Sequence, residues 1–154
     1  KEVSSVIVDA KAINLGSGRV GIYLLLSDDT GSATVIQDVS DRLSSSDTRP
    51  LTDTVSVYLA SDVTYTLNVR YEFNSGESTT EAIVQAAEDY QDWQDNTIGR
   101  AFNPEKLIAL MYQAGATRVQ ILATSNFNGG TVEYTAIDPS ERCKGTISLT
   151  AVAV

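Results

Sequence analysis

The chain has 154 residues, with 20 acidic and 11 basic side chains and a formal net charge of -9. It contains no histidine and a single cysteine, Cys143. These counts exclude a Ser-His-Asp or Cys-His catalytic site, a zinc site of about four Cys or His ligands, and an internal disulfide. The acidic balance argues against binding to nucleic-acid phosphates or to an anionic membrane surface.

The length suits one domain or two small subdomains, and the composition is that of a globular protein. No apolar run approaches the roughly 20 residues that span a bilayer. The chain opens on Lys1 and leads directly into strand-like sequence, without a recognisable signal peptide. We therefore expect a processed chain or a fragment of a longer protein.

The first third of the chain predicts three strands and one helix. Residues 3–13 and 20–26 are rich in Val, Ile and Leu and predict two strands, separated by a turn at Gly16, Ser17 and Gly18. Apolar residues at helical spacing over residues 35–43 predict an amphipathic helix, with Ser32 or Thr34 as its N-cap. Residues 55–59 predict a third strand.

The remainder begins with the clearest strand, residues 63–73, where apolar and polar side chains alternate throughout. Ser78 and Glu81 fit a capping box at the start of a helix that continues to about residue 97. Asn103 and Pro104 predict the start of a second helix, and Gly115 its end. Residues 118–123, 131–136 and 145–152 predict three further strands, with a hairpin turn at residues 128–130.

This order of elements predicts an α+β fold with two small two-layer subdomains, in which helices pack on one face of mostly antiparallel sheets. The first subdomain, residues 1–62, is strand-strand-helix-strand. The second, residues 63–154, is strand-helix-helix followed by three strands. The two are expected to meet near Ser61 and Asp62.

Three short motifs have possible chemical readings, and each is better explained structurally. Residues 16–21 match G-x-G-x-x-G, but the glycines precede a predicted strand and not the helix that a dinucleotide site requires. Asp28 and Asp29 lack the later ligands of an EF-hand loop, so a solvated turn is favoured. Cys143 has no neighbouring His or second Cys that would support a reactive role. The sequence thus predicts no catalytic, cofactor-binding or metal-binding residue.

Acidic side chains gather along the first helix of the second subdomain. No basic residue occurs between positions 77 and 95. A solvated helix face is the simplest interpretation, and a docking surface for a basic partner is the alternative. Paired catalytic carboxylates would need different environments, which these similar positions do not offer. The hypothetical interface consists of Glu77, Glu81, Glu88, Asp92 and Asp95.

An ordered set of segments resembles the carboxy-terminal half of baseplate J-like proteins, which are wedge components of contractile phage tails and related injection machines. The segments begin with residues 18–26, a Gly-led apolar strand, and residues 35–57, a helix followed by Arg-Pro-Leu-Thr-Asp leading into a strand. The long strand at residues 63–73 comes next, and then residues 98–111, 114–121 and 145–149. The chain departs from the family pattern at Ala114, Gly115 and Ala116, where the family usually has Pro-Gly-Val. The amino-terminal region of the family is also missing.

The resemblance implies a structural role without enzymatic activity or cofactors. It implies partners among other baseplate wedge and fibre-linking subunits, self-association in the assembled ring, and a place in the virion tail baseplate after assembly in the bacterial host cytoplasm. The acidic balance predicts no nucleic-acid or membrane partner.

Two other functions remain open. A carbohydrate- or peptide-binding module would use tyrosines such as Tyr58, Tyr65, Tyr71 and Tyr134 in a concave site, although alternation places Tyr65 and Tyr71 on a buried face. An enzyme with carboxylate or metal chemistry would bring several acids together in one pocket.

Overall fold

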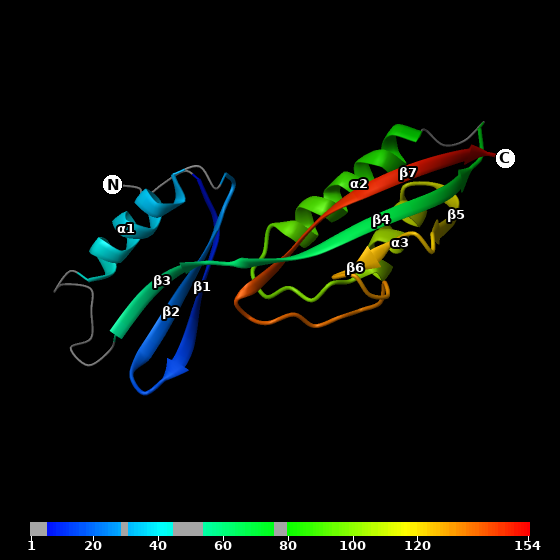
Figure 1. Ribbon diagram of the computed structural model, residues 1–154. Coiled ribbons are helices and arrows are strands. Elements are labelled where there is room, and N and C mark those ends of the chain that lie inside the picture. The colour runs from blue at the N-terminus through cyan, green and yellow to red at the C-terminus, as the bar shows by residue number, and fades with distance from the viewer. Residues whose placement is uncertain (1–5, 29–30, 45–53, 76–79) are drawn as a thin grey trace.

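The computed structural model describes residues 6–28, 31–44, 54–75 and 80–154. The described residues contain three helices and seven strands, and the strands form two sheets. One sheet has the order β1-β2-β3. In the other, β4 pairs with β5 and β6 along one edge and with β7 along the other. Figure 1 shows the two sheets end to end, with β3 leading almost directly into β4. The predicted α+β class, with mostly antiparallel sheets and helices packed on them, is confirmed. Each sheet also contains one parallel pair.

The first sheet is built on an antiparallel hairpin of β1 (Ile7–Gly16) and β2 (Arg19–Leu26). Its turn contains Gly16, Ser17 and Gly18, all with positive φ, which explains the glycines on either side of the serine. The glycines therefore open a strand, as predicted, and not a helix. The third strand, β3 (Thr54–Leu59), pairs with β2 in parallel.

Helix α1 (Ser32–Leu43) packs its apolar stripe on this sheet. Leu24, Leu26 and Val39 are the buried centre of the contact, and neighbouring half-buried aliphatic side chains extend it. The predicted N-cap is wrong. Gly31 holds that position with φ 78, and its carbonyl oxygen accepts from the amides of Thr34 and Val35. Only glycine takes this left-handed conformation without strain. Gly31 is therefore the N-cap residue, and Ser32 and Thr34 lie within the helix.

The second sheet is organised around β4 (Ser61–Phe73). Val63, Tyr65, Leu67, Val69 and Tyr71 are all buried, which confirms the predicted alternation. Strands β5 (Ala116–Ile121) and β6 (Asn126–Phe127) pair antiparallel with β4. Strand β7 (Glu141–Ala153) pairs in parallel along the whole of β4.

Helices α2 (Thr80–Asp95) and α3 (Pro104–Gln113) pack on the face that carries the buried β4 side chains. The predicted start of α3 is confirmed, because the Asn103 side chain accepts from the Lys106 amide at 3.2 Å and Pro104 follows. Gly115, with φ 106, comes directly after the last turn, as predicted. Of the proposed capping box of α2, Ser78 lies outside the described residues.

The predicted strand over residues 131–136 is wrong. Asn128 and Gly129 do form a tight turn with positive φ, closed by a bridge between Phe127 and Gly130. Beyond it the chain makes only one isolated bridge, between Phe102 and Thr135. The hydrogen bonds that a strand would place in the sheet go instead to the segment before α3, at 2.8 and 3.0 Å.

Gly145 on β7 supplies a test of the parallel β4–β7 pairing. A Cβ atom there would overlap the backbone carbonyl oxygen and the ring of Tyr65, its register partner. We predict that Gly145→Ala lowers the free energy of unfolding by about 2–3 kcal/mol, because neither group can move without disturbing the core. Urea denaturation measures the change.

Gly130→Ala is the matched control, because the nearest atom to its added Cβ is the Phe127 carbonyl oxygen at 3.5 Å, an ordinary contact. It should cost less than about 0.5 kcal/mol. Equal effects of the two substitutions would contradict the parallel register.

Candidate interaction surface

Three of the predicted interface residues form an exposed acidic face on α2. Glu81, Glu88 and Asp92 are all exposed, because the opposite side of the helix buries Ile83, Ala87 and Tyr90 in the core. We call Glu81, Glu88 and Asp92 the acidic face. Glu77, the fourth predicted member, lies outside the described residues.

The fifth predicted member, Asp95, is not on this exposed face. It is half-buried at the last turn of α2, where its carboxylate accepts from the Tyr65 hydroxyl at 2.9 Å and from the Gly145 amide at 3.3 Å. Burial raises the pKa of Asp95 above its ordinary value despite these hydrogen bonds. Burial, together with the charge of Asp95, also raises the pKa of Tyr65. Asp95 thus connects α2 to β4 and β7. The helical pattern of the sequence grouped Asp95 with the exposed acids, because the pattern does not show that the last turn of α2 lies against the sheet.

A buried glutamine next to it connects α2 to the start of α3. Gln94 is completely buried. Its side-chain oxygen accepts from the Asn103 amide at 3.1 Å, and its nitrogen donates to the Ala101 carbonyl at 3.2 Å. No sequence signal other than its place in the apolar stripe identifies this role.

Trp93 lies beside two cations that compensate the carboxyl end of α2. The guanidinium carbon of Arg100 is 4.2 Å and the amine of Lys106 is 4.6 Å from its ring centroid. Arg100 also donates to the Trp93 backbone carbonyl. A positive charge at a helix carboxyl terminus is stabilising, and so is a cation over an indole ring. Trp93 therefore has a packing role, and it also lies against the hydrophobic core of the second sheet.

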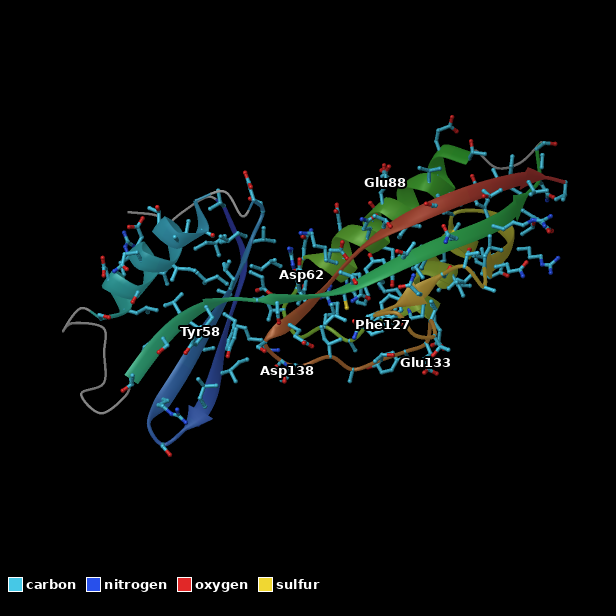
Figure 2. All side chains as sticks on the ribbon, viewed as in Figure 1. Tyr58, Asp62, Glu88, Phe127, Glu133 and Asp138 are labelled. Atoms are coloured by element: carbon cyan, nitrogen blue, oxygen red, sulfur yellow. The ribbon has the colours of Figure 1, made fainter. Side chains whose placement is uncertain are left out.

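Charged groups also gather where the two sheets meet, around Asp62 (Figure 2). Its carboxylate accepts from Arg142 at 2.6 Å and lies 3.3 Å from the amine of Lys144. Burial raises the pKa of Asp62, but the hydrogen bond and the charge of Arg142, with a contribution from Lys144, outweigh it. The net pKa is below the ordinary value. Arg142 is only 9 % exposed, so Asp62 compensates a nearly buried charge.

A second contact joins the sheet face opposite α1 to the segment between α2 and α3. Asp9 accepts from the Ile98 amide at 2.8 Å, and Lys11 donates to the Ile98 carbonyl at 3.4 Å. Leu25, paired with Asp9 across the hairpin, is 2 % exposed. Two charged residues at alternate positions of β1 thus bind both backbone groups of one residue, Ile98, in the other half. The sequence alone does not reveal this contact between distant segments.

The part of the chain that the structure describes offers no constellation suited to catalysis. It contains no group of three or more His, Cys, Asp or Glu placed to hold a metal ion. Burial, with the nearby charge of Asp95, raises the pKa of the Cys143 thiol to about 12, so the thiolate nucleophile is not formed near neutral pH. Within the same residues, no helix has both the length and the apolar character needed to cross a bilayer.

Three surface hollows on the described part of the chain do not resemble a sugar or peptide pocket. The largest of the three, about 600 Å³, lies along residues 121–132 and is lined by Ile121, Leu122 and six small or aliphatic residues. A second, about 420 Å³, lies at the β1–β2 turn, and a third, about 220 Å³, lies beside Asp62 and Arg142. No aromatic side chain lines any of the three, whereas Tyr65 and Tyr71 are buried as predicted.

Replacing Asp62 should reveal its role at the junction. We predict that Asp62→Asn lowers the free energy of unfolding by about 1–3 kcal/mol at pH 7, because it leaves the nearly buried Arg142 without its charge partner. The lowered pKa means that this stabilisation is present above the pKa of an unfolded Asp, about 4, and is lost as pH falls through the folded value. Denaturant unfolding between pH 7 and pH 3 measures both effects.

Glu72→Gln is the control, since Glu72 pairs with Arg118 at 3.5 Å and the Arg118 side chain is 63 % exposed. This exposed pair should contribute less than about 0.5 kcal/mol. A difference between wild type and Asp62→Asn that stays constant across the pH range would show that the carboxylate charge is not responsible.

Residues 1–58 match the family model described as the baseplate J-like central domain. This range includes β1, β2 and α1 and ends on Tyr58 in β3. No curated protein matches the chain. The family match confirms the predicted resemblance to baseplate J-like proteins and indicates a structural role in phage baseplates. It falls on the central domain of that family, so the predicted placement in the carboxy-terminal half stays a prediction. Residues 1–58 are thus similar to the baseplate J-like central domain.

Proposed function

We propose that the protein is a structural wedge subunit of the baseplate of a contractile phage tail or phage-like particle, acting in tail assembly through protein–protein contacts. The observation that carries this proposal is the match of residues 1–58 to the baseplate J-like central domain. The family is structural rather than catalytic, and we propose no enzymatic activity for this chain.

We further propose that the chain comprises two domains, residues 1–62 and 63–154, that meet near Ser61 and Asp62. Each sheet has its own hydrophobic core, around Leu24 and Val39 in one and around Leu67 and Tyr90 in the other, which supports the division. Because the matched model describes a central domain, the second domain would be the part of the subunit that follows it, in the carboxy-terminal half.

The proposed partners are other wedge and fibre-linking subunits, together with further copies of this chain in the assembled ring. The acidic face supports this, since Glu81, Glu88 and Asp92 are exposed and α2 contains no basic residue over residues 80–95. Like charges gathered on one face favour a partner of opposite charge. The proposed location is the tail baseplate of the virion, assembled in the cytoplasm of the bacterial host.

Reconstitution tests the function. The full-length protein is produced together with the products of the genes that flank its own, and the assemblies are separated by size and viewed by electron microscopy. We expect the protein to be incorporated into baseplate-like assemblies, and deletion of its gene to stop their formation. Complete baseplates that form without it, while it stays free in solution, would overturn the proposal.

A further inference from the structure

The β7 strand leaves one edge of the second sheet open. In an extended strand the N–H and C=O of one residue point to one side and those of the next residue to the other. The Gly145 amide donates to Asp95 and its carbonyl accepts from Gln91, so its backbone groups point away from β4. By the same alternation the backbone groups of Ile147, Leu149, Ala151 and Ala153 point away from β4. The even-numbered residues point toward β4 instead, as shown by the Val154 amide, which donates to the Phe73 carbonyl.

We call the outward backbone groups of Ile147, Leu149, Ala151 and Ala153 the β7 edge. These groups have no backbone partner within residues 6–28, 31–44, 54–75 and 80–154. They extend over about 20 Å at the usual rise of a strand. Residues 145–154 contain no charged side chain and no proline.

Other edge strands of the protein carry the features that protect edges from pairing. The edge strand β1 contains Asp9 and Lys11 and has two register irregularities. The edge strand β5 is short and contains Arg118, and its pairing with β4 has a register shift near Phe73. Charges, bulges and short length are the usual protections of a sheet edge, and the β7 edge has none of them. Such an edge is suited to accept an added strand.

Helix α2 places negative charge beside this edge. Gln91 and Asp95 contact Gly145, and Val84 and Glu88 continue the same stripe of α2 at helical spacing. Figure 2 shows Glu88 projecting from α2 on the side away from β4. Burial and, after it, the charge of Glu81 raise the pKa of Tyr71, the register partner of Ala151, so Glu81 lies near the far end of the edge.

We propose that the β7 edge accepts an extended segment of a basic partner protein, which adds to the sheet as a further strand. The segment carries Lys or Arg at alternate positions on the side that faces α2, opposite Glu81 and Glu88. Its other side continues the row of Thr146, Ser148 and Thr150, whose exposed hydroxyls favour Thr or Ser neighbours. This inference rests on the proposed structural function and specifies how the subunit binds one neighbour.

A second copy of the chain is a poorer occupant. Pairing of two β7 edges about a two-fold axis would bring the two α2 helices side by side, because α2 lies over β7. Glu81 and Glu88 of each copy would then lie close to those of the other, and like charges at an interface oppose association. The charge on α2 therefore favours a basic segment from a different protein.

The test uses the 154-residue chain and a capped ten-residue peptide that alternates lysine with threonine. The control peptide has five lysines followed by five threonines, so that charge and composition are equal. Amide hydrogen exchange by NMR is measured with and without each peptide. In the free protein we expect the outward amides of Leu149, Ala151 and Ala153 to exchange faster than the inward amides of Ser148 and Thr150. The alternating peptide should slow the exchange of the outward amides, and the control peptide should not.

Two substitutions separate the backbone from the charge. Ala151→Pro removes an outward N–H without removing a β4–β7 hydrogen bond, and it should weaken binding of the alternating peptide about tenfold. Ala151→Val keeps the N–H and should bind like wild type. Glu88→Gln should weaken binding about two- to fivefold at low salt, whereas Asp38→Asn on α1 should not.

The inference is wrong if both peptides bind equally well, or if Ala151→Pro leaves the affinity for the alternating peptide unchanged. If the proline variant does not fold, Glu88→Gln still tests the inference. The inference is also wrong, in favour of a second copy, if the chain dimerises without peptide and Ala151→Pro abolishes the dimer. In the reconstituted particle, Ala151→Pro should lose one neighbour while wild type assembles. Failure of wild type to enter baseplates would instead remove the proposed function.

Discussion

The position of β4 at the centre of the second sheet determines where every other element of that half lies. Its buried side chains supply the surface on which α2 and α3 pack, and its two edges receive β5 and β6 on one side and β7 on the other. The strand also continues the direction of β3, from which only Ala60 separates it. A change in the register of β4 would therefore exchange its buried and exposed faces and displace the whole half.

The sequence predicted those elements whose local pattern agrees with their final environment. The alternation around Leu67 and the Asn103–Pro104 helix start are of this kind. The sequence could not predict which strands pair, because the parallel match of β4 with β7 joins segments about 80 residues apart. Residues 131–136 alternate like a strand, yet their hydrogen bonds go to Phe102. In that segment the tertiary contact with Phe102 prevails over the local strand pattern.

For the candidate surface, composition alone located the acids and the structure determined their roles. Glu81, Glu88 and Asp92 remain exposed, whereas Asp95 turns to Tyr65 because the helix end crosses the sheet. The junction contacts of Asp9, Lys11 and Asp62 had no sequence signal at all. Each is an ordinary charged residue in a strand, and only the folded chain brings it to the backbone or to the opposite charge that it contacts.

The position of Trp93 has a consequence for spectroscopy. It is the single tryptophan of the chain and lies on α2 beside two cations of the second half. In the first sheet Tyr23 and Tyr58 stack on each other, with ring centroids 5.3 Å apart. Indole emission therefore reports only on the half built around β4, while far-ultraviolet circular dichroism reports on both. Unfolding curves from the two signals coincide if the junction makes the halves one cooperative unit, and they separate if each half unfolds independently.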